Sequence, residues 1–211
     1  MTAGIQAVRL QPRYRETLTI GALNSLWSTN VFHKVTEYSQ EYQDINLRLI
    51  TGHTYDIIPK IQNGSIDIGF VNSPPCTPFF KTIHYKEESI QLVGSPKLVK
   101  RLGTISTLDL PYIHFHWGMP FTEWFEEEIG KQDTIRIRVD NLAIVLQFIL
   151  QGKGIGFLLD SISRRYINNG QLLPIKLKSS YAIPARLVYI IYAVEKANKI
   201  KEFLDYINQK Q

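Results

Sequence analysis

The sequence has 211 residues, enough for one domain with a generous core or for two small domains. Hydrophobic residues make up 44% of the chain and charged residues 20%, a balance that excludes an intrinsically disordered protein. The formal net charge of +5 comes from lysines and arginines that are scattered rather than clustered. It therefore favours an ordinary solvated basic surface over a nucleic-acid-binding face.

The sequence predicts no targeting signal. No stretch approaches the roughly 18 consecutive apolar residues of a membrane span. Residues 1–17 contain basic side chains but no apolar run behind them, so they do not form a secretory signal. The single cysteine, Cys76, excludes an internal disulfide and is compatible with a reducing compartment. We therefore expect a cytoplasmic protein that has no membrane partner.

The first part of the chain predicts alternating strands and helices, because its apolar periodicity switches between two and about 3.6 residues. Asp56 is expected to cap the second of these helices, which places Pro59 in the first turn, where its missing N–H costs nothing. The predicted elements are strands at 18–22, 45–50 and 66–71, and helices at 29–42 and from 56 onward. Short connections between them imply a parallel sheet with right-handed crossovers.

A second α/β set follows the Asn-Ser-Pro-Pro break at residues 72–75. Asn141 and Asp160 are expected to be helix N-caps, and glycines after three of the helices are expected to end them. The predicted elements are strands at 89–94, 112–115, 135–139, 155–159 and 187–194, and helices at 122–129, 142–151, 161–167 and around 200–207.

Two such lobes, linked by strands near 88–94 and 183–190, would leave a cleft between them. Ligands of open α/β sheets bind beyond the carboxyl ends of the strands, where helix N-termini offer free N–H groups. Loops 22–29, 52–56 and 114–122 occupy such positions and are rich in hydrogen-bonding groups. The topology therefore predicts a binding site formed by these three loops.

Several segments together resemble the effector-binding domain of LysR-type transcriptional regulators. They are LTIGALNSLWS, INLRLITGHTYDIIPKIQNGSIDIGFVNSPP, ESIQLVGSPK, LPYIHF and NLAIVLQFILQGKGIGFLLDSISRRYINNGQL. Each alone is a weak motif, but they occur in the order and at the spacing of that family, over about residues 17–209. The resemblance implies a two-lobed α/β fold of the periplasmic-binding-protein type (type II). In this fold each lobe is a mixed, mostly parallel sheet flanked by helices.

The resemblance also implies a division of the chain. Lobe I is expected to comprise residues 17–92 and 186–211, and lobe II residues 93–185. Residues 1–16 would be the remnant of a linker, because family members carry an N-terminal winged helix-turn-helix, and the segment IQAVRLQPRYRE is too short to hold one. We therefore expect a fragment, natural or engineered, that contacts DNA only through the missing N-terminal domain.

In the family the effector lies in the cleft. Carried over by position, the expected effector-binding residues are Asn24, Ser25, Trp27, Thr54, Tyr55, Asn72, His116, Trp117, Gly118 and Asn141. Simpler roles remain open for four of them: helix capping alone for Asn24, Ser25 and Asn141, and packing between the lobes for Trp27. These loops contain no pair of arginines that would fix a carboxylate.

Catalytic and metal sites are not expected. The sequence contains no Gly-x-Ser-x-Gly, phosphate-loop or His-Glu-x-x-His motif, and the glycine-rich run 152–156 precedes a strand rather than opening a helix. His114 and His116, even with His53 or His84, have no nearby cysteine or acidic pair to complete a zinc site. A structural role for His114 is the simplest interpretation. We therefore expect no enzyme activity, no metal and no cofactor.

The sequence thus predicts a ligand-sensing domain that binds a small anionic metabolite between its lobes. The resemblance further implies a homodimer, or a tetramer at full length, with the helix at 32–42 of one subunit near the helix at 142–151 of the other. The main alternative is a solute-binding protein of a transport system, which shares the architecture but needs export or a lipid anchor. An enzyme built on a related two-lobed fold is a third interpretation.

Overall fold

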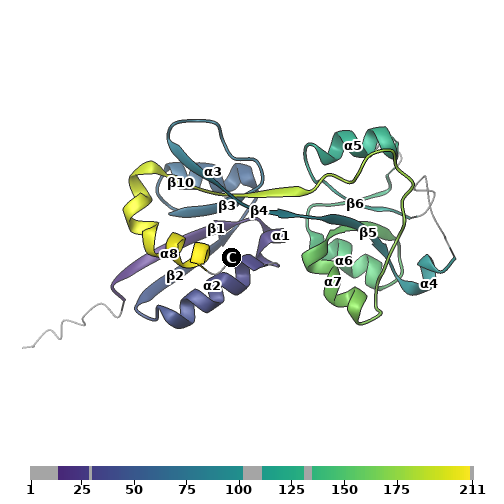
Figure 1. Cartoon of the computed structure of the whole chain (residues 1–211), viewed down its shortest axis with the longest axis horizontal. Coiled ribbons are helices and arrows are strands. Elements are labelled where there is room, and N and C mark those ends of the chain that lie inside the picture. The colour runs from purple at the N-terminus through teal and green to yellow at the C-terminus, as the bar shows by residue number, and fades with distance from the viewer. Residues whose placement is uncertain (1–13, 29, 102–110, 131–134, 210–211) are drawn as a thin grey trace, which may run out of the picture.

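Two separate sets of β-sheet organise the chain, and each set carries its own helices, so that the molecule has two lobes (Figure 1). The computed structural model describes residues 14–28, 30–101, 111–130 and 135–209. Residues 1–13, which make up most of the predicted linker remnant, lie outside the described part, as does Thr29, the predicted start of a helix. None of the described helices combines the length and the apolar character needed to cross a membrane.

Lobe I is built on a five-stranded sheet. Its strands are β1 (Glu16–Ala22), β2 (Ile45–Thr51), β3 (Ile68–Val71), β4 (Phe80–Glu88) and β10 (Arg186–Ala193). Their order in space is β2-β1-β3-β10-β4. β1 pairs in parallel with β2 and β3, as the strand–helix–strand pattern predicts. β10 runs antiparallel to β3 and β4, which makes the sheet mixed.

Helices cover both faces of this sheet. They are α1 (Asn24–Trp27), α2 (Asn30–Glu41), α3 (Thr54–Gln62) and α8 (Ala197–Gln209), with a short 3₁₀ turn η2 (Val194–Lys196) before α8. α2 and α8 contribute Tyr38 and Phe203 to one buried cluster, while α3 contributes Ile57 and Ile61 to another. Gly69 allows α3 to lie close to β3, because a Cβ at this position would be 2.8 Å from Cδ1 of Ile61.

Lobe II contains two smaller sheets. Its elements are β5 (Ile90–Gly94), α4 (Pro96–Val99), β6 (Ile113–Phe115), α5 (Phe121–Glu128), β7 (Ile137–Val139), α6 (Leu142–Leu150), β8 (Ile155–Leu159), α7 (Asp160–Asn168) and β9 (Leu173–Pro174). β5 runs antiparallel to β8 and β9, whereas β6 and β7 are parallel. The core is markedly aromatic, since Phe157 contacts the rings of Tyr112, Phe121, Trp124 and Phe125. The mixed sheets and flanking helices confirm the predicted fold class.

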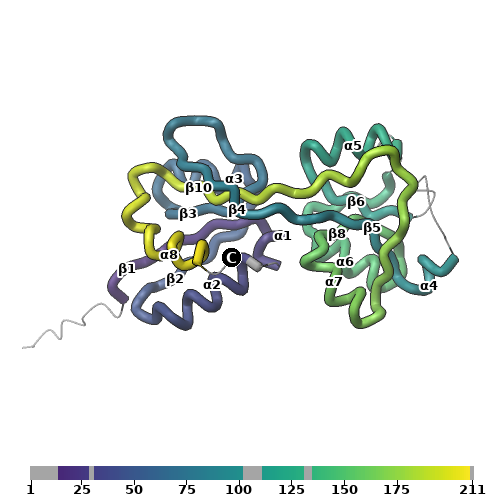
Figure 2. The backbone as a smooth tube through the Cα atoms, in the orientation of Figure 1, coloured from purple at the N-terminus to yellow at the C-terminus, as the bar shows by residue number. Residues whose placement is uncertain are grey.

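Two neighbouring strands connect the lobes (Figures 1 and 2). β4 ends at Glu88 in the first sheet, and β5 begins at Ile90 in the second. The return path reaches lobe I at Arg186, which pairs with Glu88. Glu88 is buried, accepts a hydrogen bond from Ser161 Oγ at 2.8 Å and forms an ion pair with Lys86. The predicted lobe boundaries at 92/93 and 185/186 stay predictions.

Two predicted helix starts are wrong, by two residues for α3 and by one for α7. α3 begins at Thr54 with His53 as its N-cap, and Asp56 instead accepts a hydrogen bond from His53 N at 2.9 Å, as the reciprocal half of a capping box. α7 begins at Asp160 with Leu159 as its N-cap, because the Asp160 carboxylate is used by Gln91 and Arg164 instead. The predicted cap at Asn141 is confirmed, since its Oδ1 accepts from Ala143 N.

Candidate functional site

Arg186, the first residue of β10, borders two chambers that lie between the lobes. Among the described residues that line these chambers, it is the only one shared by both. Each chamber has walls from both lobes, so a molecule bound in either would contact both.

The first of these, here called the polar chamber, lies at the carboxyl ends of parallel strands. β1 and β2 of lobe I and β6 and β7 of lobe II all end at its walls. It has a volume of about 150 Å³ and is lined by Leu23, Asn24, Ser25, Thr51, Gly52, His53, Phe115, Asp140, Asn141, Leu142 and Arg186. This is the position that the topology argument predicts for a ligand site.

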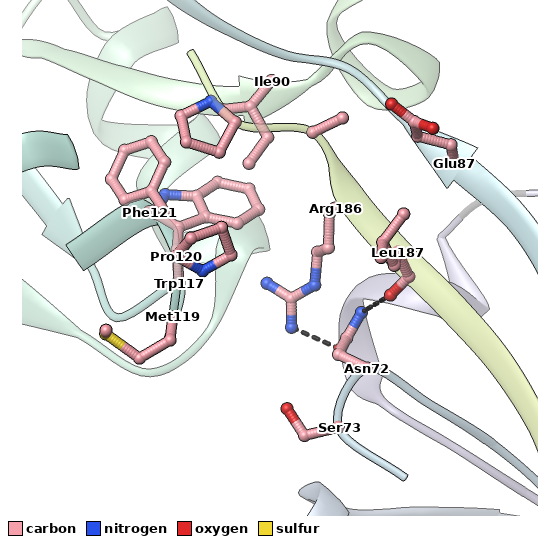
Figure 3. Close-up of a pocket in the computed structure, with 12 residues that line it drawn as sticks. Asn72, Ser73, Glu87, Ile90, Trp117, Met119, Pro120, Phe121, Arg186 and Leu187 are labelled. Carbon is pink, nitrogen blue, oxygen red and sulfur yellow. Dashed lines mark hydrogen bonds between the residues drawn. The ribbon is translucent and has the colours of Figure 1, made fainter. Parts of the chain in front are cut away.

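The second, here called the apolar chamber, has a volume of about 250 Å³ (Figure 3). Its walls are Asn72, Ser73, Glu87, Ile90, Trp117, Met119, Pro120, Phe121, Pro184, Ala185, Arg186 and Leu187. The loop between β6 and α5 supplies three of these residues, and α5 itself supplies Phe121. A cis peptide bond joins Met119 to Pro120 within the loop. The chamber therefore presents rings and aliphatic carbons from lobe II to the guanidinium of Arg186 (Figure 3).

Within the described part of the chain, the guanidinium of Arg186 makes one hydrogen bond. Its Nη2 donates to Asn72 Oδ1 at 2.5 Å, and Asn72 Nδ2 in turn donates to the Leu187 carbonyl at 2.9 Å. Nε and Nη1 have no exposed surface and no acceptor among the described residues. The guanidinium carbon lies 5.2 Å from the ring centre of Trp117 and 5.9 Å from that of Phe115. The two aromatic rings stabilise the buried positive charge through cation–π contacts. They offset only part of the cost of burial, because buried N–H groups without an acceptor are energetically unfavourable.

Electrostatics leave this guanidinium charged at neutral pH. Burial lowers the pKa of Arg186 to about 10, and the negative charge of Glu88 opposes that shift. A buried cation with unused N–H groups attracts an acceptor that carries negative charge, such as a carboxylate. The arrangement can therefore bind an anion.

The structure brings five of the ten predicted effector-binding residues to the two chambers. Asn24, Ser25 and Asn141 line the polar chamber, and Asn72 and Trp117 line the apolar one. The amide of Asn72 is already engaged by Arg186 and Leu187, so it positions the guanidinium. Which of these residues touch an effector stays a prediction.

The other five predicted residues lie outside the described chamber walls: Trp27, Thr54, Tyr55, His116 and Gly118. Trp27 packs on the core of lobe I, and its indole N–H is 3.4 Å from the Ile50 carbonyl. Tyr55 is 71% exposed and stacks on His53, with ring centres 5.1 Å apart. Thr54 forms the first turn of α3, while Gly118 adopts a positive φ of 77° in the loop before α5.

Arg186 was not among the residues that the sequence predicts. The one available signal is a charged residue directly before the strongly apolar run 187–194, within the second predicted linker strand near 183–190. No local pattern reveals that this side chain meets Asn72, which lies 114 residues earlier in the chain.

His114 is buried among rings of lobe II rather than in either chamber. It lies 5.8 Å from the ring centre of Tyr112 and 5.9 Å from that of Phe125. Within the described part of the chain, no group of three or more His, Cys, Asp or Glu residues is arranged to hold a metal ion. The structure therefore favours the structural interpretation of this histidine.

The burial of His114 leads to a pH-dependent stability. Burial, reinforced by the charges of Arg138 and His116, lowers its pKa from 6.5 to about 4. Between these values the unfolded chain takes up a proton that the folded chain does not, so stability falls as the pH drops from 6.5 to 4. We expect a loss of about 2–3 kcal/mol from this residue by pH 4.5, since one pKa unit corresponds to about 1.4 kcal/mol. Urea unfolding of the wild type and of His114→Gln, measured between pH 6.5 and 4, checks this expectation. If the free energy of unfolding fell equally steeply with pH in both proteins, His114 would not be the source of the effect.

The sequence matches the family model of the LysR substrate binding domain over residues 12–211. Among curated protein sequences no relative was found. The fold is similar to that of the regulatory domain of CrgA, a LysR-type regulator from Neisseria meningitidis, with a TM-score of 0.75 and 16% identity. This alignment covers 92% of this chain and 98% of that domain.

Two further similar structures contain ligands. The effector-binding domain of QuiR in complex with shikimate aligns with a TM-score of 0.68 and 16% identity, over 92% of this chain and 97% of that one. The BenM effector-binding domain with its effector benzoate aligns with a TM-score of 0.70 and 18% identity, over 93% of this chain and 92% of that one. At these identities the likeness establishes the fold.

Proposed function

Because this chain belongs to the family of LysR substrate-binding domains, we propose that it senses a small anionic metabolite on behalf of a LysR-type transcriptional regulator. The metabolite would bind in the chambers between the two lobes, with its negative charge at Arg186. The domain would carry out no chemistry on it. We expect it to act in the cytoplasm and to reach DNA only through a DNA-binding domain.

The observation that carries this proposal is the guanidinium of Arg186, which faces the cleft with Nε and Nη1 unsatisfied among the described residues. An unsatisfied buried donor costs roughly 1–3 kcal/mol, and more when it is charged. An anion that accepts from it would recover that energy on binding. Shikimate and benzoate, the ligands of the QuiR and BenM domains, are both carboxylates, which supports an anionic ligand here.

Binding between lobes gives the ligand a way to change the protein's shape. Both chambers have walls from lobe I and lobe II, so the contacts of a ligand depend on how the lobes are placed relative to each other. Nε and Nη1 have no exposed surface, so an anion reaches them only if the Trp117 side of the cleft shifts. The ligand would favour the arrangement in which its contacts are strongest, by the difference in affinity between the two arrangements.

The experiment that tests this function is a thermal-shift screen of anionic metabolites with the purified chain, because a ligand of the native state raises its melting temperature. We expect hits among anions, with affinity reduced by Ser25→Ala in the polar chamber. A screen in which neutral and cationic compounds give the only hits would contradict the proposal.

The signal would pass to the DNA-binding domains through a dimer. Phe32 on α2 is 48% exposed and Ile144 on α6 is 43% exposed, so both helices present apolar side chains that a second copy would cover. We propose that α2 of one subunit packs beside α6 of the other.

A charge on this surface is expected to separate the subunits. Phe32→Glu and Ile144→Glu should each weaken the dimer at least tenfold, because a carboxylate would be buried without a partner. Sedimentation velocity at micromolar concentration measures this, with Tyr181→Glu, an exposed aromatic residue of lobe II, as the matched control. A wild-type chain that sediments only as a monomer would contradict the proposed dimer.

A further inference from the structure

The two chambers differ in the chemistry of their linings, and this difference limits the kind of anion that each can bind. Asn24, Ser25 and Asn141 contribute polar atoms to the lining of the smaller chamber, whereas the larger one has a higher share of carbon in its walls. A carbon-walled chamber gains little from a hydrated anion alone, because removing the water around a charge is costly. It gains most from a ligand that also carries an apolar body.

Two aromatic side chains, Trp117 and Phe121, line the apolar chamber. Trp117 and Phe121 lie 5.7 Å apart between ring centres at an angle of 45°, and Pro120 and Pro184 add two more rings to the lining. Trp117 and Phe121 are almost fully buried, so their rings are fixed in place by the core of lobe II. Rigid aromatic walls favour a planar group that packs face or edge against them.

The size of the apolar chamber limits the ligand to roughly one ring. Its volume is about 250 Å³. An apolar cavity of about 150 Å³ is enough to hold benzene, while pockets for drug-sized ligands begin near 300 Å³. One six-membered ring and a short anionic substituent therefore fit, whereas a two-ring ligand would need the lobes to open.

The position of the Arg186 guanidinium determines how a ligand would be oriented in the apolar chamber. Figure 3 shows the guanidinium of Arg186 projecting from β10 towards Trp117, with Asn72 and Ser73 on its other side. Glu87, an acidic member of the lining, lies apart from the guanidinium beyond Leu187 (Figure 3). An anionic group at Arg186 thus leaves the body of the ligand beside Trp117 and Phe121.

From these observations we infer that the ligand is a carboxylate carried on a single planar apolar ring, with the ring in the apolar chamber and the carboxylate at Arg186. The inference rests on the proposed function and narrows it from anions in general to this class. Arg186 selects the charge, and the Trp117–Phe121 side of the chamber selects the ring.

Three small probes separate these two contributions in calorimetric titrations of the full chain. Benzoate has a ring and a charge, benzamide has the ring without the charge, and acetate has the charge without the ring. We expect benzoate to bind at least tenfold more tightly than either of the others. Benzoate that binds no better than acetate, or not at all, would overturn the inference.

Two substitutions in the apolar chamber test where the ring lies. Ala185→Leu adds volume to the wall outside any regular strand, and should weaken benzoate at least tenfold while leaving acetate within twofold. Leu187→Ala removes a 40% exposed side chain from the wall, and should weaken benzoate three- to tenfold. Leu49→Ala is the matched control, because Leu49 is a 45% exposed leucine on β2 that lies outside both linings.

These titrations also distinguish a failure of the ring requirement from a failure of the proposed anion-sensing function. Anions that bind with equal affinity whether or not they carry a ring, and that lose affinity in Arg186→Gln, would remove the ring requirement and keep the anion sensor. Benzoate that binds tightly but is unaffected by both chamber substitutions would place the ring elsewhere and overturn the inference.

Discussion

Replacing Arg186 by glutamine is expected to weaken binding of the anionic ligand at least a hundredfold, or about 3 kcal/mol. The substitution removes the charge at the junction of the two chambers, and hydrogen bonds between charged groups contribute about 1.5–3 kcal/mol each. The same substitution should not destabilise the ligand-free protein. Its melting temperature should stay the same or rise, because a buried cation with two unsatisfied nitrogens is no longer present.

The matched control for this experiment is Arg164→Gln. Arg164 is a 70% exposed arginine that forms an ion pair with Asp160 on α7, and it does not line either chamber. Its loss should leave affinity within twofold. Titration calorimetry with the best hit of the metabolite screen measures both variants. Equal affinity of Arg186→Gln and wild type would contradict the placement of the anion at Arg186.

Replacing Asp67 by alanine is expected to lower the free energy of unfolding by about 3 kcal/mol. This is the lower end of the range for breaking a buried ion pair, because the two lysine partners are 28% and 32% exposed. Asp67 is only 2% exposed, and it lies where β1, β3 and α8 meet. One carboxylate oxygen accepts from Thr19 N at 2.9 Å and from Lys199 Nζ at 2.6 Å, while the other lies 3.5 Å from Lys196 Nζ. Alanine would leave the amide and both ammonium groups without this partner.

Urea unfolding measures the loss of stability in Asp67→Ala. Two further variants show whether the loss comes from the charge of Asp67 and from its burial. Asp67→Asn retains an acceptor for Thr19 N but not the charge, so it should cost about half as much. Asp205→Asn removes an exposed carboxylate that pairs with Lys201 on α8, and should cost less than about 0.5 kcal/mol. Equal losses for Asp67→Ala and Asp205→Asn would show that the Asp67 network contributes no more than a surface ion pair.

Elements with strong local signals could be predicted from the sequence. The apolar runs at 18–22 and 155–159 became buried strands, and Asn141 became an N-cap, because periodicity and capping depend on neighbouring residues. β4 was missed, since it is an edge strand of the first sheet and its mixed pattern of exposed and buried residues lacks a clear alternation. The predicted starts of α3 and α7 differ from the observed ones for two reasons. At α3 both His53 and Asp56 take part in the capping box, and at α7 the Asp160 carboxylate is used by Gln91 and Arg164.

The site was harder to predict, because it depends on contacts between distant segments. The loops after β1 and β2 were correctly expected at the carboxyl ends of parallel strands, where topology alone brings them together. Arg186 was not, since its role depends on a strand that runs antiparallel to β3 and on a hydrogen bond to Asn72. The separation of the cleft into a polar and an apolar chamber likewise follows from side-chain packing around Trp117, which no spacing rule reveals.

The measurement that tests the central claim most directly is a crystal structure of the chain with the best hit of the metabolite screen. The proposal places an anionic oxygen of the ligand within hydrogen-bonding distance, about 2.7–3.1 Å, of the Arg186 guanidinium, with walls from both lobes in contact with the ligand. A ligand bound outside both chambers, with Arg186 still bonded only to Asn72, would contradict it.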